Sequence, residues 1–127
     1  MEEKKKEQYI LIKTNGEIST VAISDCQLLD KCYELLDCSC IEIVRISHDI
    51  TYIVDESGKI KENPKEVNPI CSALYAGTVY GDPIVGDVLV GIELAPELYG
   101  YNPGMLEEKL KFFNSIKKNL FPSEVEK

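Results

Sequence analysis

The chain has 127 residues, of which 44% are hydrophobic and 28% charged, and this is the size and composition of one globular domain rather than of a disordered or fibrous protein. Its net charge of −8 at pH 7 repels nucleic-acid phosphates, so direct nucleic-acid binding is not expected. No apolar run approaches the roughly 18 to 20 residues that cross a bilayer, and the first residues have no secretory signal, which together predict a cytoplasmic protein.

The first structured element is predicted to be a β-hairpin. Residues 1–7 are charged, and we expect them to be disordered. The stretch QYILIKTNGEISTVAI then sets two β-rich runs around Asn15-Gly16, which is the strongest short signal for a hairpin. We therefore expect a single domain over residues 8–121, followed by a polar tail over 122–127.

A helix is predicted directly after this hairpin. Ser24, with Gln27 three residues later, is typical of a capping box at a helix start. Leu28, Cys32 and Leu35 then fall on one face of the helix. We expect that face to pack on the sheet.

The middle of the chain predicts a second hairpin and a short helix. CIEIVRI (40–46) and ITYIVDE (50–56) are β-branched runs joined by the link SHD, and a turn follows at Gly58. Asn68 and Pro69 suit the N-cap and first position of a short helix that ends before Gly77. GDVLVGI (86–92) reads as a further strand.

The last element is the clearest amphipathic helix. Residues 93–104 are predicted to be loop, and Asn102-Pro103 marks the helix start. Apolar residues then recur at spacings of three and four: Leu106, Leu110, Phe113, Ile116 and Leu120. The chain as a whole therefore predicts an α+β domain, in which a small, mostly antiparallel sheet of about five strands carries two to three helices.

The glycines of GTVYGDPIVGDVLVG (77–91) raise the question of a phosphate-binding loop. Gly81 and Gly86 have the spacing of the motif G-x-x-x-x-G-K-[ST]. Asp87 and Val88, however, stand where the motif needs lysine and a hydroxyl, and a strand rather than a helix follows. We interpret these glycines as turns on the approach to a strand.

The cysteines and the single histidine predict neither a metal site nor an active site. Five cysteines form an odd set without the rhythm of a disulfide module, and we read them mostly as buried thiols. They also lack the paired short spacing of a zinc site, so no metal or cofactor is expected. His48 lies in the predicted SHD turn with no nucleophile located beside it, so we predict that the protein is not an enzyme.

Four residues are the candidates for a binding surface. Arg45 is the only arginine and lies on an otherwise apolar strand, where its guanidinium could grip a carboxylate or phosphate. Asn68 could donate or accept hydrogen bonds, and Tyr75 and Tyr80 in or beside Gly-rich loops could stack on a ligand.

The order of these pieces resembles a small family, the domain of unknown function 3846, found in phages and conjugative elements of Gram-positive bacteria. An N-terminal hairpin and helix lead to four stretches that carry the likeness: CIEIVRI, YIVDESGKI, NPICSALY and DPIVGDVLVG. The likeness covers roughly residues 8 to 92, and the helix over 103–119 lies beyond it. The family supplies no catalytic residues, and the resemblance implies a protein of a mobile element in the host bacterial cytosol.

These observations favour a non-enzymatic accessory protein that acts by binding. Its expected target is a host-defence protein or the small nucleotide signal of such a system, which it would sequester as a counter-defence factor. The alternatives are an acidic inhibitor that imitates DNA on a host nucleic-acid enzyme, and a small enzyme that uses His48 or a cysteine. The apolar C-terminal helix and an unpaired sheet edge would also allow a homodimer.

Overall fold

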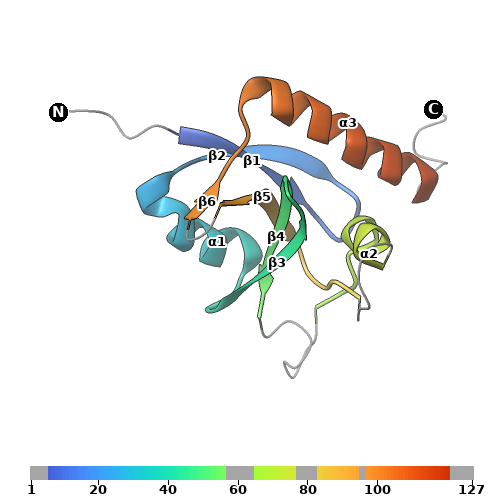
Figure 1. Cartoon of the computed structure of the whole chain (residues 1–127). Helices are drawn as coiled ribbons and strands as arrows, with labels where there is room; N and C mark the ends of the chain where they lie inside the picture. The colour runs from blue at the N-terminus through green and yellow to red at the C-terminus, as the bar shows by residue number, and fades with distance from the viewer. Residues whose placement is uncertain (1–5, 57–64, 77–82, 95–96, 121–127) are drawn as a thin grey trace.

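A single antiparallel sheet with helices on both faces forms the protein (Figure 1). The computed structural model describes residues 6–56, 65–76, 83–94 and 97–120. In chain order its elements are β1 (Lys6–Ile12), β2 (Ile18–Ser24), a 3₁₀ turn η1 (Asp25–Gln27), α1 (Leu28–Leu36), β3 (Ile41–Ser47), β4 (Ile50–Asp55), α2 (Pro69–Ala76), β5 (Val88–Leu94), β6 (Glu97–Tyr99) and α3 (Pro103–Leu120). The predicted α+β class and antiparallel sheet are confirmed.

Some predicted features fall outside the described residues. They are the charged N-terminus up to residue 5, the turn at Gly58, residues 77–82 with Gly77, Tyr80 and Gly81, and the tail from residue 121. None of the described helices has both the length and the apolar composition that a membrane span requires.

The predicted N-terminal hairpin is confirmed, and glycine closes it. The Gly16 N–H donates to the Lys13 carbonyl over 3.0 Å, and the Lys13 N–H donates to the Glu17 carbonyl over 2.9 Å. Gly16 has φ +95°, a left-handed conformation that glycine adopts without steric cost. A type I turn followed by such a residue is a common three-residue hairpin loop, so the Asn-Gly pair sets the turn.

The helix after the hairpin is confirmed, but its predicted capping box is not formed. The Ser24 hydroxyl donates to the Gln27 side chain over 3.2 Å instead of capping a backbone N–H. The chain makes the 3₁₀ turn η1 first, so α1 begins only at Leu28 and its N-cap residue Gln27 makes no side-chain cap bond. Cys32 is buried on the predicted face, and Leu28 and Leu35 are partly buried there.

The strands follow the order β2-β1-β5-β4-β3, and neighbours are antiparallel throughout. The three inner strands are covered on both faces, which explains their nearly continuous apolar runs. One core cluster lies between the sheet and α1 and includes Tyr9, Leu11, Ile53 and Leu89. The other lies between the sheet and α2 with α3, and includes Ile10, Ile12, Tyr52, Val90 and Phe113.

A sixth strand, β6, lies where the sequence predicted only loop over residues 93–104. It folds back on the end of β5, with Ile92 opposite Tyr99, and the Tyr101 N–H then donates to the Gln8 carbonyl over 2.7 Å. Glycines permit this approach, because a Cβ on Gly100 would lie 2.7 Å from the Gln8 carbonyl oxygen. The prediction was wrong because the strand depends on these long-range contacts and has little local signal of its own.

The predicted C-terminal helix is confirmed as α3, which begins at Pro103. The Asn102 side chain caps it by accepting from the Met105 N–H over 2.8 Å. Phe113 is fully buried, whereas Leu120 at the end of the predicted apolar stripe is 42% exposed. Lys109 shares the buried face of α3 although the sequence analysis gave it no role.

Asn68 ties three separate segments of the fold together. Its side-chain oxygen accepts from the Cys71 N–H over 3.2 Å and so caps α2 as predicted. Its side-chain nitrogen donates to the Ile12 carbonyl at the end of β1 over 2.9 Å and to the Gly86 carbonyl before β5 over 3.0 Å. Because Asn68 is completely buried, water cannot replace these bonds.

Replacing Asn68 by alanine should destabilise the protein strongly. The variant Asn68→Ala leaves the Ile12 and Gly86 carbonyls and the Cys71 N–H short of a partner, and each buried unpaired group costs about 1–3 kcal/mol. We expect a loss of about 3 kcal/mol in the free energy of unfolding, since part of each cost is relieved by relaxation. Urea unfolding followed by circular dichroism measures this loss.

Asn114 offers a matched control on the surface. Its exposed side chain makes one bond, to the Leu110 carbonyl over 2.8 Å. We expect Asn114→Ala to change the free energy of unfolding by no more than about 0.5 kcal/mol. Equal, small losses in both variants would show that Asn68 does not hold the fold together.

Candidate functional site

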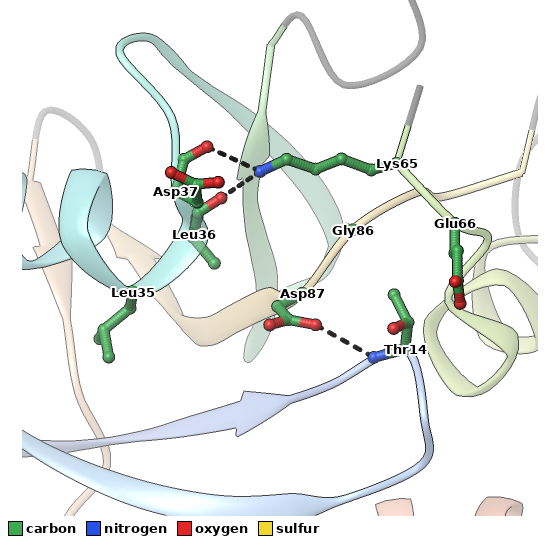
Figure 2. Close-up of a pocket in the computed structure, with 8 residues that line it drawn as sticks. All are labelled: Thr14, Leu35, Leu36, Asp37, Lys65, Glu66, Gly86 and Asp87. Carbon is green, nitrogen blue, oxygen red and sulfur yellow. Dashed lines mark hydrogen bonds between the residues drawn. The ribbon is translucent and has the colours of Figure 1, made fainter. Parts of the chain in front are cut away.

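A cavity of about 310 Å³ opens between the C-terminal end of α1 and the segment that enters β5 (Figure 2). Its volume is near the lower limit of small-ligand sites in proteins. Eight residues line it: Thr14, Leu35, Leu36, Asp37, Lys65, Glu66, Gly86 and Asp87. It is our candidate functional site.

Lys65, the lysine among the described residues that line the cavity, makes polar contacts within the protein. Its ammonium group donates to the Leu36 carbonyl and, over 2.9 Å, to the Asp37 carbonyl, both at the C-terminal end of α1 (Figure 2). A cation at that position is favoured by the helix dipole. The Lys65 nitrogen also lies 3.1 Å from the Asp55 carboxylate, whose side chain is 2% exposed. The lysine charge is therefore balanced by a buried carboxylate and a helix end.

Carboxylates are in excess among the described residues that line the cavity. Asp37, Glu66 and Asp87 all border it. One Asp87 oxygen accepts from the Thr14 N–H over 3.1 Å, which fixes that side chain at the wall. Among the described residues of the lining there is one lysine to these three carboxylates, and the Lys65 ammonium group also lies 3.1 Å from the Asp55 carboxylate. The cavity should attract an ammonium or guanidinium group and repel phosphate.

Gly86 lines one wall of the cavity and is one of the two glycines whose spacing resembles a phosphate-binding loop. It has φ +80°, and a Cβ there would lie 2.9 Å from the Lys65 side chain. Its N–H donates to the Glu66 carbonyl over 2.7 Å and its carbonyl accepts from Asn68 over 3.0 Å. Gly86 is thus a turn residue ahead of β5, as the sequence predicted.

Of the four predicted binding residues, Arg45 and Asn68 are described with their side chains, and neither is among the residues that line this cavity. Arg45 is exposed on the edge strand β3. Asn68 is completely buried, and its side-chain nitrogen and oxygen bond to the backbone. The backbone of Tyr75 is the end of α2, but its side chain lies outside the described part of the chain, as does all of Tyr80. The structure therefore does not bring these four residues together into a described site.

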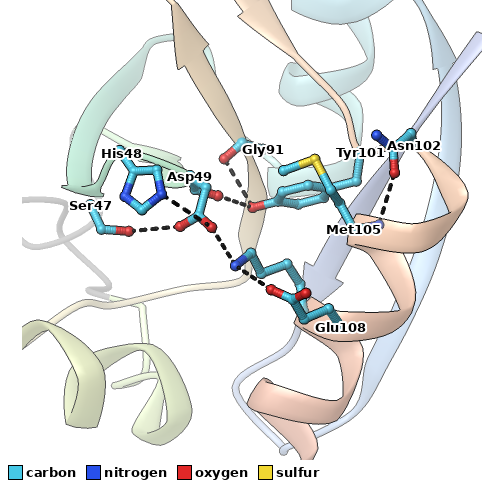
Figure 3. Close-up of polar contacts among 9 residues, drawn as sticks. Ser47, His48, Asp49, Gly91, Tyr101, Asn102, Met105 and Glu108 are labelled. Carbon is cyan, nitrogen blue, oxygen red and sulfur yellow. Dashed lines mark hydrogen bonds and ion pairs between the residues drawn. The ribbon is translucent and has the colours of Figure 1, made fainter.

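A second polar cluster lies where the β3–β4 turn meets α3 (Figure 3). The Lys109 nitrogen lies 2.5 Å from one carboxylate oxygen of Asp49, and the Lys109 side chain is only 10% exposed. The Tyr101 hydroxyl is placed to donate to the Asp49 carbonyl over 2.7 Å and to the Gly91 carbonyl over 3.2 Å. These contacts attach the β3–β4 turn to α3 and to the segment that precedes it.

The ion pair shifts the pKa values of both partners. Burial alone would raise the pKa of Asp49, but the hydrogen bonds from Lys109 and Ser47, with the charges of Lys109 and His48, lower it below its ordinary value of 3.8. Burial alone would lower the pKa of Lys109, but its contacts with Asp49 and Glu108 raise it above 10.5. Both charged forms are therefore stabilised in the folded protein.

His48 and the cysteines do not form a catalytic arrangement among the described residues. The His48 side chain is 88% exposed, with one nitrogen 3.8 Å from the Asp49 carboxylate. Burial, with a smaller effect from Cys38, raises the pKa of the Cys32 thiol to about 12, and burial raises that of Cys71 well above its usual range. Those two thiols stay protonated at neutral pH and are poor nucleophiles. In the described ranges no three His, Cys, Asp or Glu side chains are grouped to hold a metal ion.

The residues that line the cavity could not be identified from the sequence. Thr14, Asp37, Lys65 and Asp87 come from four distant segments, and no local pattern joins them. Lys109 did carry a signal. It is three residues after Leu106 and four before Phe113, so it belongs to the apolar face of α3 and needs a buried partner there.

A family model described as "Domain of unknown function (DUF3846)" matches residues 6–93. The matched stretch runs from β1 into β5 and includes every residue that lines the cavity, whereas β6 and α3 follow it. No curated protein and no solved structure matches the chain.

Removing the cation of the second cluster should give a pH-dependent loss of stability. We expect Lys109→Met to lower the free energy of unfolding by about 2 kcal/mol at neutral pH, because a hydrogen-bonded charge pair is lost. Asp49 has a lowered pKa, so its contribution is complete above 3.8 and is lost as the pH falls through the folded value below that. Lys109 has a raised pKa, so its contribution is complete below 10.5 and is lost at higher pH. Urea unfolding of both proteins between acid and alkaline pH measures the difference.

Lys111 provides the control for this experiment. It pairs with Glu107 over 3.4 Å, and both side chains are more than 70% exposed. We expect Lys111→Met to have little effect at any pH, because exposed pairs contribute little. A Lys109→Met loss that stays the same from acid to alkaline pH would contradict the assigned ion pair.

Proposed function

The chain belongs to the DUF3846 family, whose description assigns no activity, and from this premise we propose that it is a non-enzymatic accessory protein of a phage or mobile element that binds a host-defence protein. The observation that carries this proposal is the excess of carboxylates among the described residues that line the cavity, where the single lysine, Lys65, is paired with Asp55. Such a cavity suits a lysine or arginine side chain presented by a partner protein.

The other described groups support binding rather than catalysis. Four other polar residues already make hydrogen bonds or ion pairs within the fold: Asn68, Asp49, Lys109 and Tyr101. The buried thiols are protonated at neutral pH, as their raised pKa values indicate. An enzyme would need a nucleophile and a base that meet in a cavity, and none of the described residues that line this cavity is a histidine or a cysteine.

The overall charge favours the same kind of partner. A net charge of −8 speeds encounter with a basic protein surface and slows encounter with an anion. The cavity would then select one cationic side chain within that surface. Charge would steer the association, and the cavity would give it specificity.

Reversing one charge at the cavity should abolish partner capture. We expect immobilised wild-type protein to retain a host protein from lysate at low salt and to release it as salt rises. The variant Glu66→Lys should lose this capture, because it adds a cation where the partner's cation is expected to bind. Mass spectrometry of the retained proteins at graded salt measures the effect.

Glu107→Lys is the matched control, because it changes the net charge by the same amount at an exposed position of α3 that is not part of the cavity lining. We expect it to retain the partner. Equal weakening by both variants would favour the alternative of an acidic inhibitor that imitates DNA through its whole surface charge. Undiminished capture by Glu66→Lys would show that the cavity is not the binding site.

Nucleotide binding is a second candidate, and Arg45 is the observation that favours it. This arginine is exposed, so its guanidinium is open to a phosphate from solvent. If the protein sequesters a cyclic nucleotide, that ligand should raise the melting temperature of the wild type but not of Arg45→Gln. Flat thermal-shift curves across a panel of cyclic nucleotides would argue against this candidate.

A further inference from the structure

The two outer edges of the sheet differ in how they are protected. β3 carries Glu42 and Arg45, and its register with β4 is interrupted between Arg45 and Ser47. β2 has the sequence ISTVAIS, with no charge, proline or glycine, and stays in unbroken register with β1 from Ile18 to Ser24. Proteins usually blunt exposed edges with charges, prolines or bulges, because an open edge invites another strand. By this criterion β3 is protected and β2 is not.

The hydrogen bonds of β1 show which backbone groups of β2 point outward. The carbonyls of Gln8 and Ile12 accept from Tyr101 and Asn68, on the side of β1 away from β2. Their partners in register are Ala22 and Ile18. In an antiparallel ladder bonded and non-bonded pairs alternate, so Ile18, Thr20, Ala22 and Ser24 direct their N–H and C=O groups away from β1.

The outer edge of β2 is accessible within the described residues. No described strand pairs with it, and Thr20 and Ala22 at its centre are both exposed. Since each outward residue offers one donor and one acceptor, the edge presents a regular row of groups that need partners. An added antiparallel strand would satisfy them.

We propose that this partner is a second copy of the same chain, joined through β2 to β2 in an antiparallel pair centred on Val21. A two-fold axis through Val21 sets Thr20 opposite Ala22 of the second copy, and Ile18 opposite Ser24. All four direct their backbone groups outward; Thr20 and Ala22 are exposed, so the two central pairs can each exchange two N–H···O bonds, whereas Ser24 is only 6% exposed and its pair is not needed for the central pairing. Paired residues also share a face of the sheet, so the two sheets join into one.

The distribution of charge favours β2 as the place where two copies of the chain pair. Two chains of net charge −8 repel each other, so they can meet only where few charges come together. The seven residues of β2 carry none, whereas α1, α3 and β3 all carry exposed carboxylates. A neutral edge gives no electrostatic advantage to the cationic partner proposed for the cavity. The net charge of each copy opposes the association, so added salt, which screens this repulsion, should strengthen the dimer.

A proline at a position of β2 whose N–H points away from β1 should disrupt the dimer without disrupting the fold. The N–H of Ala22 makes no ladder bond to β1, so Ala22→Pro removes a dimer bond and leaves the hairpin ladder intact. We expect the wild type to sediment as a dimer, Ala22→Pro as a folded monomer, and the control Ala22→Ser as a dimer. A wild type that stays monomeric at every concentration, or a folded Ala22→Pro that stays dimeric, would overturn the proposal.

A pair of charge variants tests the register and remains informative if the proline variant does not fold. In Thr20→Lys/Ala22→Lys the new side chains oppose each other across the axis, and the dimer should be lost. In Thr20→Lys/Ala22→Glu the opposed side chains carry opposite charges, and the dimer should return. Dimers in both double variants, or in neither, would refute the pairing centred on Val21.

Added salt should have opposite effects on the dimer and on the capture of a cationic partner. Sedimentation of the wild type should show a tighter dimer at high salt, whereas capture of a cationic partner should weaken there. Glu66→Lys lies in the cavity and should leave the dimer unchanged. A dimer that dissociates as salt rises would contradict the neutral-edge pairing, whatever the outcome of the capture experiment.

Discussion

The buried side chain of Asn68 is the constraint on which the arrangement of the cavity depends. It holds the end of β1, the turn before β5 and the first turn of α2 at hydrogen-bonding distance from one another. Thr14 follows the first of these segments, and Asp87 follows the second. Because the carbonyls of Ile12 and Gly86 bind the same amide, the Thr14 N–H comes within 3.1 Å of the Asp87 carboxylate. One buried amide thus positions two walls of the cavity, and its role is structural and indirect.

Two lysines explain why the molecule presents negative charge where it does. Lys65 is drawn inward by Asp55 and the end of α1, and Lys109 by Asp49. Each would be costly to bury alone, and each is retained because its partner is within hydrogen-bonding reach. Their charges stabilise the fold, so they are not available to neutralise the exposed carboxylates. At the cavity, the pairing of Lys65 therefore leaves carboxylates in excess among the described residues of the lining.

The sequence predicted those features that depend on local chemistry. Asn15-Gly16 fixes its own turn, and the Asn68-Pro69 and Asn102-Pro103 pairs begin helices because cap and dihedral preference act within a few residues. The strand β6 was missed because it is three residues long and depends on contacts with β5 and Gln8. The cavity was missed for the same reason, since Lys65 reaches α1 across 28 and 29 positions of sequence. The N-cap role of Asn68 was predicted correctly from its local pattern, but its bonds to Ile12 and Gly86 could not be, because those residues are 56 and 18 positions away in the sequence.

A dimer through β2 would leave both cavities open, and this links the two proposals. Thr14 lies in the turn of the β1–β2 hairpin, five positions beyond Tyr9, which pairs with Val21. At about 3.4 Å per residue, an axis through Val21 would put the two cavities on the order of 30 Å apart, at opposite ends of the joined strands. Neither cavity then lies in the interface, and both face solvent. A partner assembly that repeats its basic surface at that spacing would be held at two points, so two weak contacts would give tight binding without any further contact surface.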